Sequence, residues 1–197
     1  MGGRGADTGG RNSFRELGEY DSARKYFEKS AKKWEESLTD KEIDAITQYT
    51  AGDEGTYDMI NNYLWSGGSK TWKTQADLID KAISKFDLPE NIMVYRGTEG
   101  ADLDLTKGSI INLKGFTSTS TDPEVAMAYA NNDIDWQYEK PVVLQISVPK
   151  GRGRGAYTAG YAMAPDESEV LLNRNSRIQV TGTRRRGGTT IVTAKLL

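Results

Sequence analysis

Two glutamates one residue apart precede an apolar run near the C-terminal end of the sequence. Glu167 and Glu169 flank a serine, and the run Val170-Leu171-Leu172 follows directly. If this segment is a strand, the two-residue period of its side chains directs both carboxylates to the same side. Such a pair suits acid/base chemistry or the stabilisation of a developing cation. The simpler alternative is a strand edge whose charged side chains face water.

A guanidinium is a second candidate for chemistry. Arg96 follows the apolar segment 92–95 and precedes Gly97. An arginine at the end of a buried strand can bind a phosphate or carboxylate in bidentate geometry. The glycine would leave room for a ligand to approach the backbone. An ordinary arginine at a strand end would look the same in the sequence.

Three consecutive hydroxyl side chains form the third candidate group. Ser118, Thr119 and Ser120 follow Gly115-Phe116-Thr117 on a predicted strand. Short hydroxyls can hold a neighbouring carboxylate by hydrogen bonds. A strand edge rich in Ser and Thr is the simpler alternative, so none of the three groups is decisive alone.

The elements that must position these groups change character halfway along the chain. Before position 91, helical spacing of apolar residues and helix-terminal signals predict four helices. The second helix begins at a capping box, Thr39 to Glu42, and stops at Gly52. The other three helices are expected at 22–37, 57–65 and 74–88.

After position 91 the pattern becomes one of short strands. A short helix begins at the Asp122-Pro123 cap and continues through 125–130. Helices followed by strands favour an α+β fold. We expect a flexible, Gly-rich leader at 1–13 and a single domain at 14–197, with a helical part to 90 and a β-rich part from 91. The strands are expected at 92–95, 110–113, 142–148, 170–172, 177–183 and 189–197.

Composition excludes several kinds of chemistry. The 197 residues contain no histidine and no cysteine, and their formal net charge is −2. Disulfides, Cys/His zinc sites, thiolate nucleophiles and Ser-His-Asp triads are therefore excluded. We find no export signal and no apolar run long enough to span a bilayer. Any catalytic role must therefore be taken by a carboxylate, a hydroxyl, a lysine or an arginine side chain.

Taken together and in order, the three groups resemble a known signature. Tyr95-Arg96-Gly97, Gly115-Phe116-Thr117-Ser118-Thr119-Ser120 and Glu167-Ser168-Glu169 resemble the Arg / Ser-Thr-Ser / Glu-x-Glu pattern of mono-ADP-ribosyltransferases, above all the binary-toxin and VIP2-like class. The likeness runs from about residue 92 to the C-terminus. It implies an α+β fold in which N-terminal helices precede a mixed β-sandwich core.

This resemblance implies a reaction and a co-substrate. Such enzymes cleave the bond between nicotinamide and ribose in NAD+ and transfer ADP-ribose through an oxocarbenium-like state; no metal is implied. A carboxylate suits stabilisation of that cation, and motif position gives this role to Glu169. Glu167 would engage the acceptor, and in this family a Glu there goes with arginine of a target protein.

The resemblance also implies a set of cofactor-binding residues. Arg96 would bind the NAD+ phosphates beside Gly97, and Ser118 would hold Glu169, while Thr119 and Ser120 shape the pocket. Related toxins often carry a second cofactor-binding arginine, for which the nearest match here is Lys140.

An acceptor-recognising aromatic is the other departure from the family pattern. It usually lies three residues before the first Glu, where this chain has Ala164, so Tyr161 is the candidate for acceptor recognition.

Other functions stay open at this point. The same NAD+ cleavage could serve a nucleic-acid acceptor or water. A nucleic-acid-binding module could use the basic stretches 151–155 and 184–188, although these are short and the net charge is negative. We expect a monomer without a membrane segment, acting as a toxin secreted or delivered into a host cell or as a phage-encoded enzyme in the bacterial cytoplasm.

Overall fold

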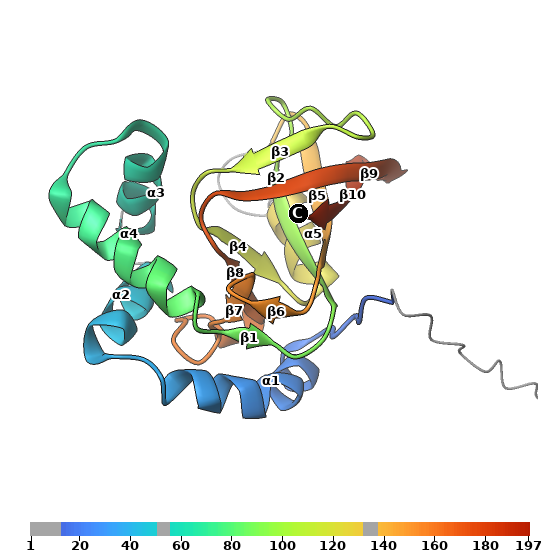
Figure 1. Ribbon diagram of the computed structural model, residues 1–197. Helices are drawn as coiled ribbons and strands as arrows, with labels where there is room; N and C mark the ends of the chain where they lie inside the picture. Colours follow the sequence, from blue (N-terminus) through green and yellow to red (C-terminus); the bar gives the residue numbers. More distant parts are fainter. Residues whose placement is uncertain (1–12, 51–55, 132–137) are drawn as a thin grey trace, which may run out of the picture.

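The computed structural model describes residues 13–50, 56–131 and 138–197 (Figure 1). Almost all of the predicted leader at 1–13, and the helix stop predicted at Gly52, lie outside the described residues.

Four helices form a layer along one side of the molecule (Figure 1). They are α1 (Tyr20–Glu35), α2 (Asp40–Thr50), α3 (Thr56–Ser66) and α4 (Lys70–Ile83). The capping box predicted for α2 is confirmed, because the Thr39 amide donates to the Glu42 carboxylate at 2.7 Å. Glu42 is fully buried and also accepts from Lys85 at 2.6 Å, so the box ties α2 to the end of α4.

The β-rich half forms one mixed sheet of eight strands, in the order β3-β9-β10-β5-β2-β4-β8-β7. A separate two-stranded ladder pairs β1 with β6. The α+β fold class is therefore confirmed. The strands are β1 (Asp87–Leu88), β2 (Ile92–Glu99), β3 (Ile110–Leu113), β4 (Thr117–Ser120), β5 (Pro141–Val148), β6 (Gly151–Arg152), β7 (Gly155–Tyr157), β8 (Glu169–Leu172), β9 (Ser176–Arg186) and β10 (Thr189–Leu196).

The two faces of the central strands pack against different helices. On β2, Val94 belongs to the main core, which includes buried residues of α1, α2, α3 and α4. Its neighbour Tyr95 belongs to a smaller cluster with Ala126 and Ala130 of α5 (Pro123–Asn131). Alternation of side chains along a strand separates these clusters. The sheet is therefore covered by the helical layer on one face and by α5 on part of the other.

Aromatic side chains join the helical layer to the sheet. Phe27 of α1 stacks on Tyr157 of β7, with ring centroids 4.5 Å apart. Trp34 packs edge-on against Phe86 and donates its indole N–H to the Ala82 carbonyl at 2.7 Å. The helical layer thus shares one hydrophobic core with the strands.

Two local differences from the sequence-based prediction bear on the site. The strand expected at 92–95 continues to Glu99, because β2 pairs with β5 as far as Glu99 opposite Pro141. The segment carrying the two glutamates is not one continuous strand. Pro165–Glu167 forms a 3-10 turn, Ser168 is left-handed with φ 51° and ψ 48°, and β8 begins only at Glu169.

Candidate active site

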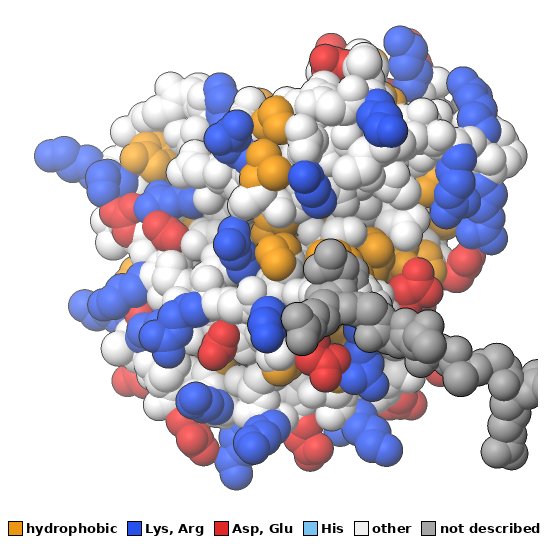
Figure 2. Space-filling model, turned by 45° about the vertical axis from the view of Figure 1, so that its right-hand side comes forward, with side chains coloured by type: hydrophobic (Ala, Val, Ile, Leu, Met, Phe, Trp, Pro, Cys, Tyr) orange, Lys and Arg blue, Asp and Glu red, His pale blue; other side chains and the backbone are white. Residues whose placement is uncertain are grey.

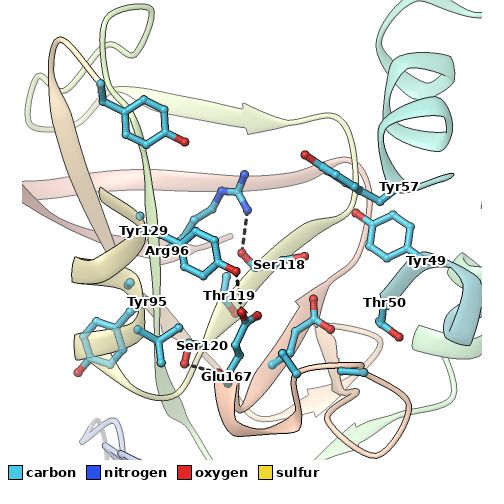
Figure 3. A pocket seen from close by; sticks show the side chains of 17 residues that line it. Tyr49, Thr50, Tyr57, Tyr95, Arg96, Ser118, Thr119, Ser120, Tyr129 and Glu167 are labelled. Atoms are coloured by element: carbon cyan, nitrogen blue, oxygen red, sulfur yellow. Dashed lines mark hydrogen bonds between the residues drawn. The ribbon is translucent and has the colours of Figure 1, made fainter. Parts of the chain in front are cut away.

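A cavity of about 470 Å³ opens between the helical layer, α5 and the turn before β8 (Figure 3). Seven of the nine predicted site residues line it, while Lys140 and Tyr161 do not. Five tyrosines contribute to its wall. The lining residues are Tyr49, Thr50, Tyr57, Tyr95, Arg96, Gly97, Ser118, Thr119, Ser120, Val125, Ala126, Tyr129, Tyr138, Ala162, Ala164, Glu167 and Glu169.

Glu169 is held at the first residue of β8 by hydroxyl groups. The Thr158 hydroxyl donates to its Oε2 at 2.6 Å, and the Ser118 side chain forms a second hydrogen bond. Burial raises the pKa of Glu169 above its ordinary value, and the two hydrogen bonds oppose that rise. Ser118 and Glu169 line the same cavity, and the role of Ser118 in holding Glu169 stays a prediction. The site therefore holds a desolvated carboxylate whose charged form is stabilised by fixed donors.

Thr158 is a site residue that the sequence analysis missed. It follows β7, in a segment predicted to be a loop, and its amide donates to the Glu169 carbonyl at 3.1 Å. Pairing of β7 with β8 brings the threonine beside the glutamate. No local sequence signal marks that pairing, because β7 is only three residues long.

Glu167 has a different set of contacts, although it lines the same cavity. The Tyr129 hydroxyl donates to its Oε1 at 2.6 Å (Figure 3). The Ser120 hydroxyl donates to its backbone carbonyl, also at 2.6 Å. The 3-10 turn and the left-handed Ser168 separate Glu167 from β8. The two carboxylates are thus positioned by separate elements and can take separate roles.

Arg96 extends from β2 into the cavity (Figure 3). Its Nη1 donates to the Ser118 carbonyl at 2.9 Å, which fixes the guanidinium beside β4. Among the described residues that line the cavity, it is the only positively charged side chain. An anionic part of a ligand would therefore bind here.

The other two hydroxyls of the Ser-Thr-Ser group secure the backbone around the glutamates. Thr119 donates to the Val170 carbonyl at 2.5 Å, and Ser120 accepts from the Asp122 amide at 2.9 Å while it donates to Glu167. These contacts tie β4 to β8, to the turn before it and to the start of α5. The group thus secures the backbone of the pocket wall.

Gly97 lines the cavity, but its missing side chain serves the packing of α5. A Cβ at this position would lie 2.2 Å from the Ala126 carbonyl oxygen and 2.5 Å from the Ala130 nitrogen. The space that we expected a ligand to use is therefore occupied by α5. The physical reason for glycine here is close approach of a helix to a strand.

Lys140 and Tyr161 lie outside the set of lining residues. Lys140 is exposed, and its amide donates to the Glu99 carboxylate at 3.2 Å. Tyr161 packs edge-on against Trp34, with ring centroids 5.9 Å apart, and its carbonyl accepts from the Thr50 hydroxyl. The structure thus gives Tyr161 a packing contact and leaves Lys140 at the surface.

Tyrosines of the helical layer complete the wall opposite Arg96 (Figure 3). Tyr49 donates to the Phe116 carbonyl at 3.3 Å and accepts from Asn61 at 2.9 Å. Its burial raises the pKa of Tyr49. The sequence placed Tyr49 on a core-facing helix position but gave no indication that it also borders a site.

The lining fits a ligand that carries a phosphate group and planar rings and on which positive charge can develop. Arg96 can bind a phosphate, tyrosine rings can pack against planar rings, and Glu169 can stabilise a cation that develops nearby. In the described parts of the chain, no three His, Cys, Asp or Glu side chains are grouped to hold a metal ion. Within the same residues, no helix has the length and apolar character needed to cross a membrane.

Solved structures share this architecture. The Clostridium limosum C3 exoenzyme aligns with a TM-score of 0.75 over 94% of this chain and 98% of its own, at 24% sequence identity. C3stau2 from Staphylococcus aureus, solved with NAD, aligns with a TM-score of 0.76 over 94% and 99%, at 20% identity. These likenesses show that the fold is that of the ADP-ribosyltransferase toxins.

Comparisons of sequence also find ADP-ribosyltransferases that are similar to this chain. An NAD+–arginine ADP-ribosyltransferase of Enterococcus faecalis is 30% identical over 151 residues, which are 75% of this chain but only 30% of the relative's length. A C3 mono-ADP-ribosyltransferase of a Clostridium botulinum D phage is 24% identical over 189 residues, 88% of this chain and 74% of that protein. The profile of the family described as ADP-ribosyltransferase exoenzyme matches residues 23–196. The chain therefore belongs to the ADP-ribosyltransferase exoenzyme family.

Proposed function

We propose that this chain is an NAD+-dependent mono-ADP-ribosyltransferase that modifies arginine of a target protein. The observation that carries the proposal is one cavity in which two carboxylates with separate supports meet a single guanidinium. Glu169 is held by Thr158 and Ser118, Glu167 is held by Tyr129, and Arg96 lies beside them.

In the first half of the reaction, NAD+ binds with its phosphates at Arg96. The bond between ribose C1′ and the nicotinamide nitrogen breaks, and its electron pair leaves with nicotinamide. Positive charge develops on C1′ and the ring oxygen. The carboxylate of Glu169 stabilises that charge, because it is desolvated and prevented by fixed donors from turning away.

In the second half, a nitrogen of the acceptor attacks C1′. An arginine guanidinium is protonated in water and has no free electron pair, so it must lose a proton as it attacks. Glu167 receives that proton, and a C1′–N bond forms. The name of the Enterococcus relative supports this choice of acceptor.

Other acceptors define the alternatives. Water would make the protein an NAD+ hydrolase, and a nucleic acid would require a basic binding surface. On the face drawn in Figure 2, acidic side chains lie among the Lys and Arg side chains mainly in the lower half. The formal net charge of −2 favours a protein acceptor over a nucleic acid.

The biological setting follows from the same likeness. A relative from a Clostridium botulinum phage supports a phage-encoded enzyme or a toxin that reaches its target cell. We propose that the catalytic chain acts as a monomer on that target protein.

The test uses NAD+ labelled in its adenylate part, with a cell lysate and with agmatine, a small guanidine. The wild type should label a protein and agmatine and release nicotinamide. Glu167→Gln should lose most labelling and keep measurable NAD+ hydrolysis. Label on RNA or DNA alone, or nicotinamide release with no labelled product, would refute arginine as the acceptor.

A further inference from the structure

The hydroxyl of Tyr129 makes a contact whose effect on the acceptor step the proposed mechanism does not specify. It donates to Oε1 of Glu167 at 2.6 Å, across the cavity from α5. Tyr129 remains 52% exposed, so the contact borders the solvent-accessible part of the site. Its burial and the adjacent Glu167 carboxylate both raise the pKa of Tyr129, so the phenol stays a neutral donor near neutral pH.

Both partners of this contact are fixed to the sheet. Tyr129 lies on α5 where that helix presses onto β2, and a Cβ on Gly97 would lie 2.9 Å from the Tyr129 Cβ. The carbonyl of Glu167 is held by the Ser120 hydroxyl at 2.6 Å. The Cβ of Tyr129 and the backbone of Glu167 are therefore held by contacts with β2 and β4. The hydrogen bond between Tyr129 and Glu167 is therefore part of the folded structure of the site.

A carboxylate held in this way cannot turn freely. Arginine and a free carboxylate pair through two parallel N–H···O bonds, which use both oxygens. Here Oε1 already accepts from Tyr129. Because each carboxylate oxygen has two lone pairs, this contact leaves both oxygens able to accept, but it fixes the orientation in which they meet an incoming N–H.

We propose that Tyr129 is the positioning residue of the acceptor step: by donating to Oε1 of Glu167, it fixes the orientation in which the carboxylate accepts from the acceptor guanidinium. This inference rests on the proposed transfer to arginine. A guanidinium nitrogen held by this carboxylate loses its proton to it and forms the bond to C1′ after nicotinamide has left with its electron pair.

The test compares Tyr129→Phe with the wild type in the ratio of agmatine labelling to NAD+ hydrolysis. The phenylalanine keeps the ring and removes the hydroxyl, so the ratio should fall roughly tenfold, the effect of one hydrogen bond to a charged group. Tyr63→Phe is the matched control, because Tyr63 lies on α3 outside the cavity lining. The control should keep the wild-type ratio. Tyr129→Leu, which removes the ring as well, should lower the ratio at least as far.

A double-mutant cycle separates positioning from general structure. If Tyr129 acts through Glu167, adding Tyr129→Phe to Glu167→Gln should lower agmatine labelling no further. Additive losses, or a wild-type ratio in Tyr129→Phe, would overturn the proposal.

The same experiment distinguishes failure of the proposed transfer to arginine from failure of the Tyr129 proposal. If the wild type leaves agmatine unlabelled, arginine is the wrong acceptor class. The ratio is then measured with the lysate protein that the wild type labels. A tenfold fall in Tyr129→Phe would still support the positioning role, and an unchanged ratio would remove it.

Discussion

At the scale of a single side chain, Glu169 has to be both buried and ionised, and burial opposes ionisation. The proposed reaction needs it ionised beside a developing cation, yet burial raises its pKa and so disfavours the ionised form. Thr158 and Ser118 reduce that conflict by donating to the carboxylate. In the proposed mechanism the remaining cost belongs to the catalytic arrangement, as is common where polar groups are desolvated for function.

Removal of the Thr158 hydroxyl should therefore weaken NAD+ cleavage. In Thr158→Val the shape is kept, but one hydrogen bond to the carboxylate is lost, which raises the pKa of Glu169 further. We expect kcat/KM for NAD+ hydrolysis to fall roughly tenfold at neutral pH. The acid limb of the pH profile should move to higher pH. A profile that coincides with the wild type would show that Thr158 does not support the ionised form.

The raised pKa of Glu169 also predicts how stability depends on pH. A carboxyl whose folded pKa is raised contributes stability below its unfolded value, near 4.5, and loses that contribution as pH rises through the folded value. At neutral pH, Glu169→Gln should therefore raise the midpoint of thermal unfolding, by about 2–4 °C for each kcal/mol of relieved cost. Below pH 4.5 the gain should vanish. A variant that is less stable than the wild type at pH 7 would contradict the burial argument.

At the scale of elements, α5 is the part of the fold that brings Tyr129 to the site. Its approach to β2 depends on Gly97, where a side chain would collide with the backbone of α5. The helix N-terminus is tied to β4 through Ser120 and Asp122. The position of this nine-residue helix thus follows from strand contacts more than from its own weak amphipathic pattern.

Gly97→Ala should accordingly disturb both stability and transfer. The added Cβ would force α5 away from β2, and overpacking of this kind typically costs about 1–3 kcal/mol. Labelling of agmatine should fall more than NAD+ hydrolysis, because Tyr129 moves with the helix. Gly188→Ala is the matched control, since a Cβ there would contact nothing within 4 Å. Equal unfolding midpoints for the two variants would refute the packing role.

The limits of sequence-based prediction are visible in the same elements. The sequence predicted the strand that leads to Arg96 and the strand that carries Ser118, because apolar runs and their flanking residues are local signals. The turn at Ser168 was not predicted, since a left-handed serine leaves no mark in the period of side chains. Thr158 and Tyr129 were missed because long-range contacts, β7 with β8 and α5 with the turn, bring them to the glutamates.

At the scale of the whole molecule, the helical layer and the sheet are joined by a shared core and by charged contacts. Arg174 follows β8 and pairs with Asp80 of α4 at 2.8 Å and with Asp77 at 2.9 Å. Its side chain is 19% exposed, so the network is partly shielded from water. The turn that ends β8 is therefore anchored to the helical layer, and Glu169 stands at the other end of that strand.

Arg174→Ala should destabilise the whole chain, because it leaves two carboxylates without their shared partner. The expected loss in free energy of unfolding is about 2 kcal/mol. Arg186→Ala is the comparison, since its pair with Glu124 is exposed and 3.5 Å long. That loss should stay below about 0.5 kcal/mol. Denaturant unfolding followed by tryptophan fluorescence and by circular dichroism checks both values, and similar losses in the two variants would contradict the anchoring role.

The central claim is a division of labour in which Glu169 cleaves NAD+ and Glu167 directs the product to its acceptor. The most direct measurement is nicotinamide release without any acceptor, for the wild type, Glu169→Gln and Glu167→Gln. We predict that Glu169→Gln loses release by roughly 100-fold or more, as expected for removal of an electrostatic stabiliser, while Glu167→Gln retains a substantial part of it. Equal loss in both variants, or release by Glu169→Gln at the wild-type rate, would contradict the account.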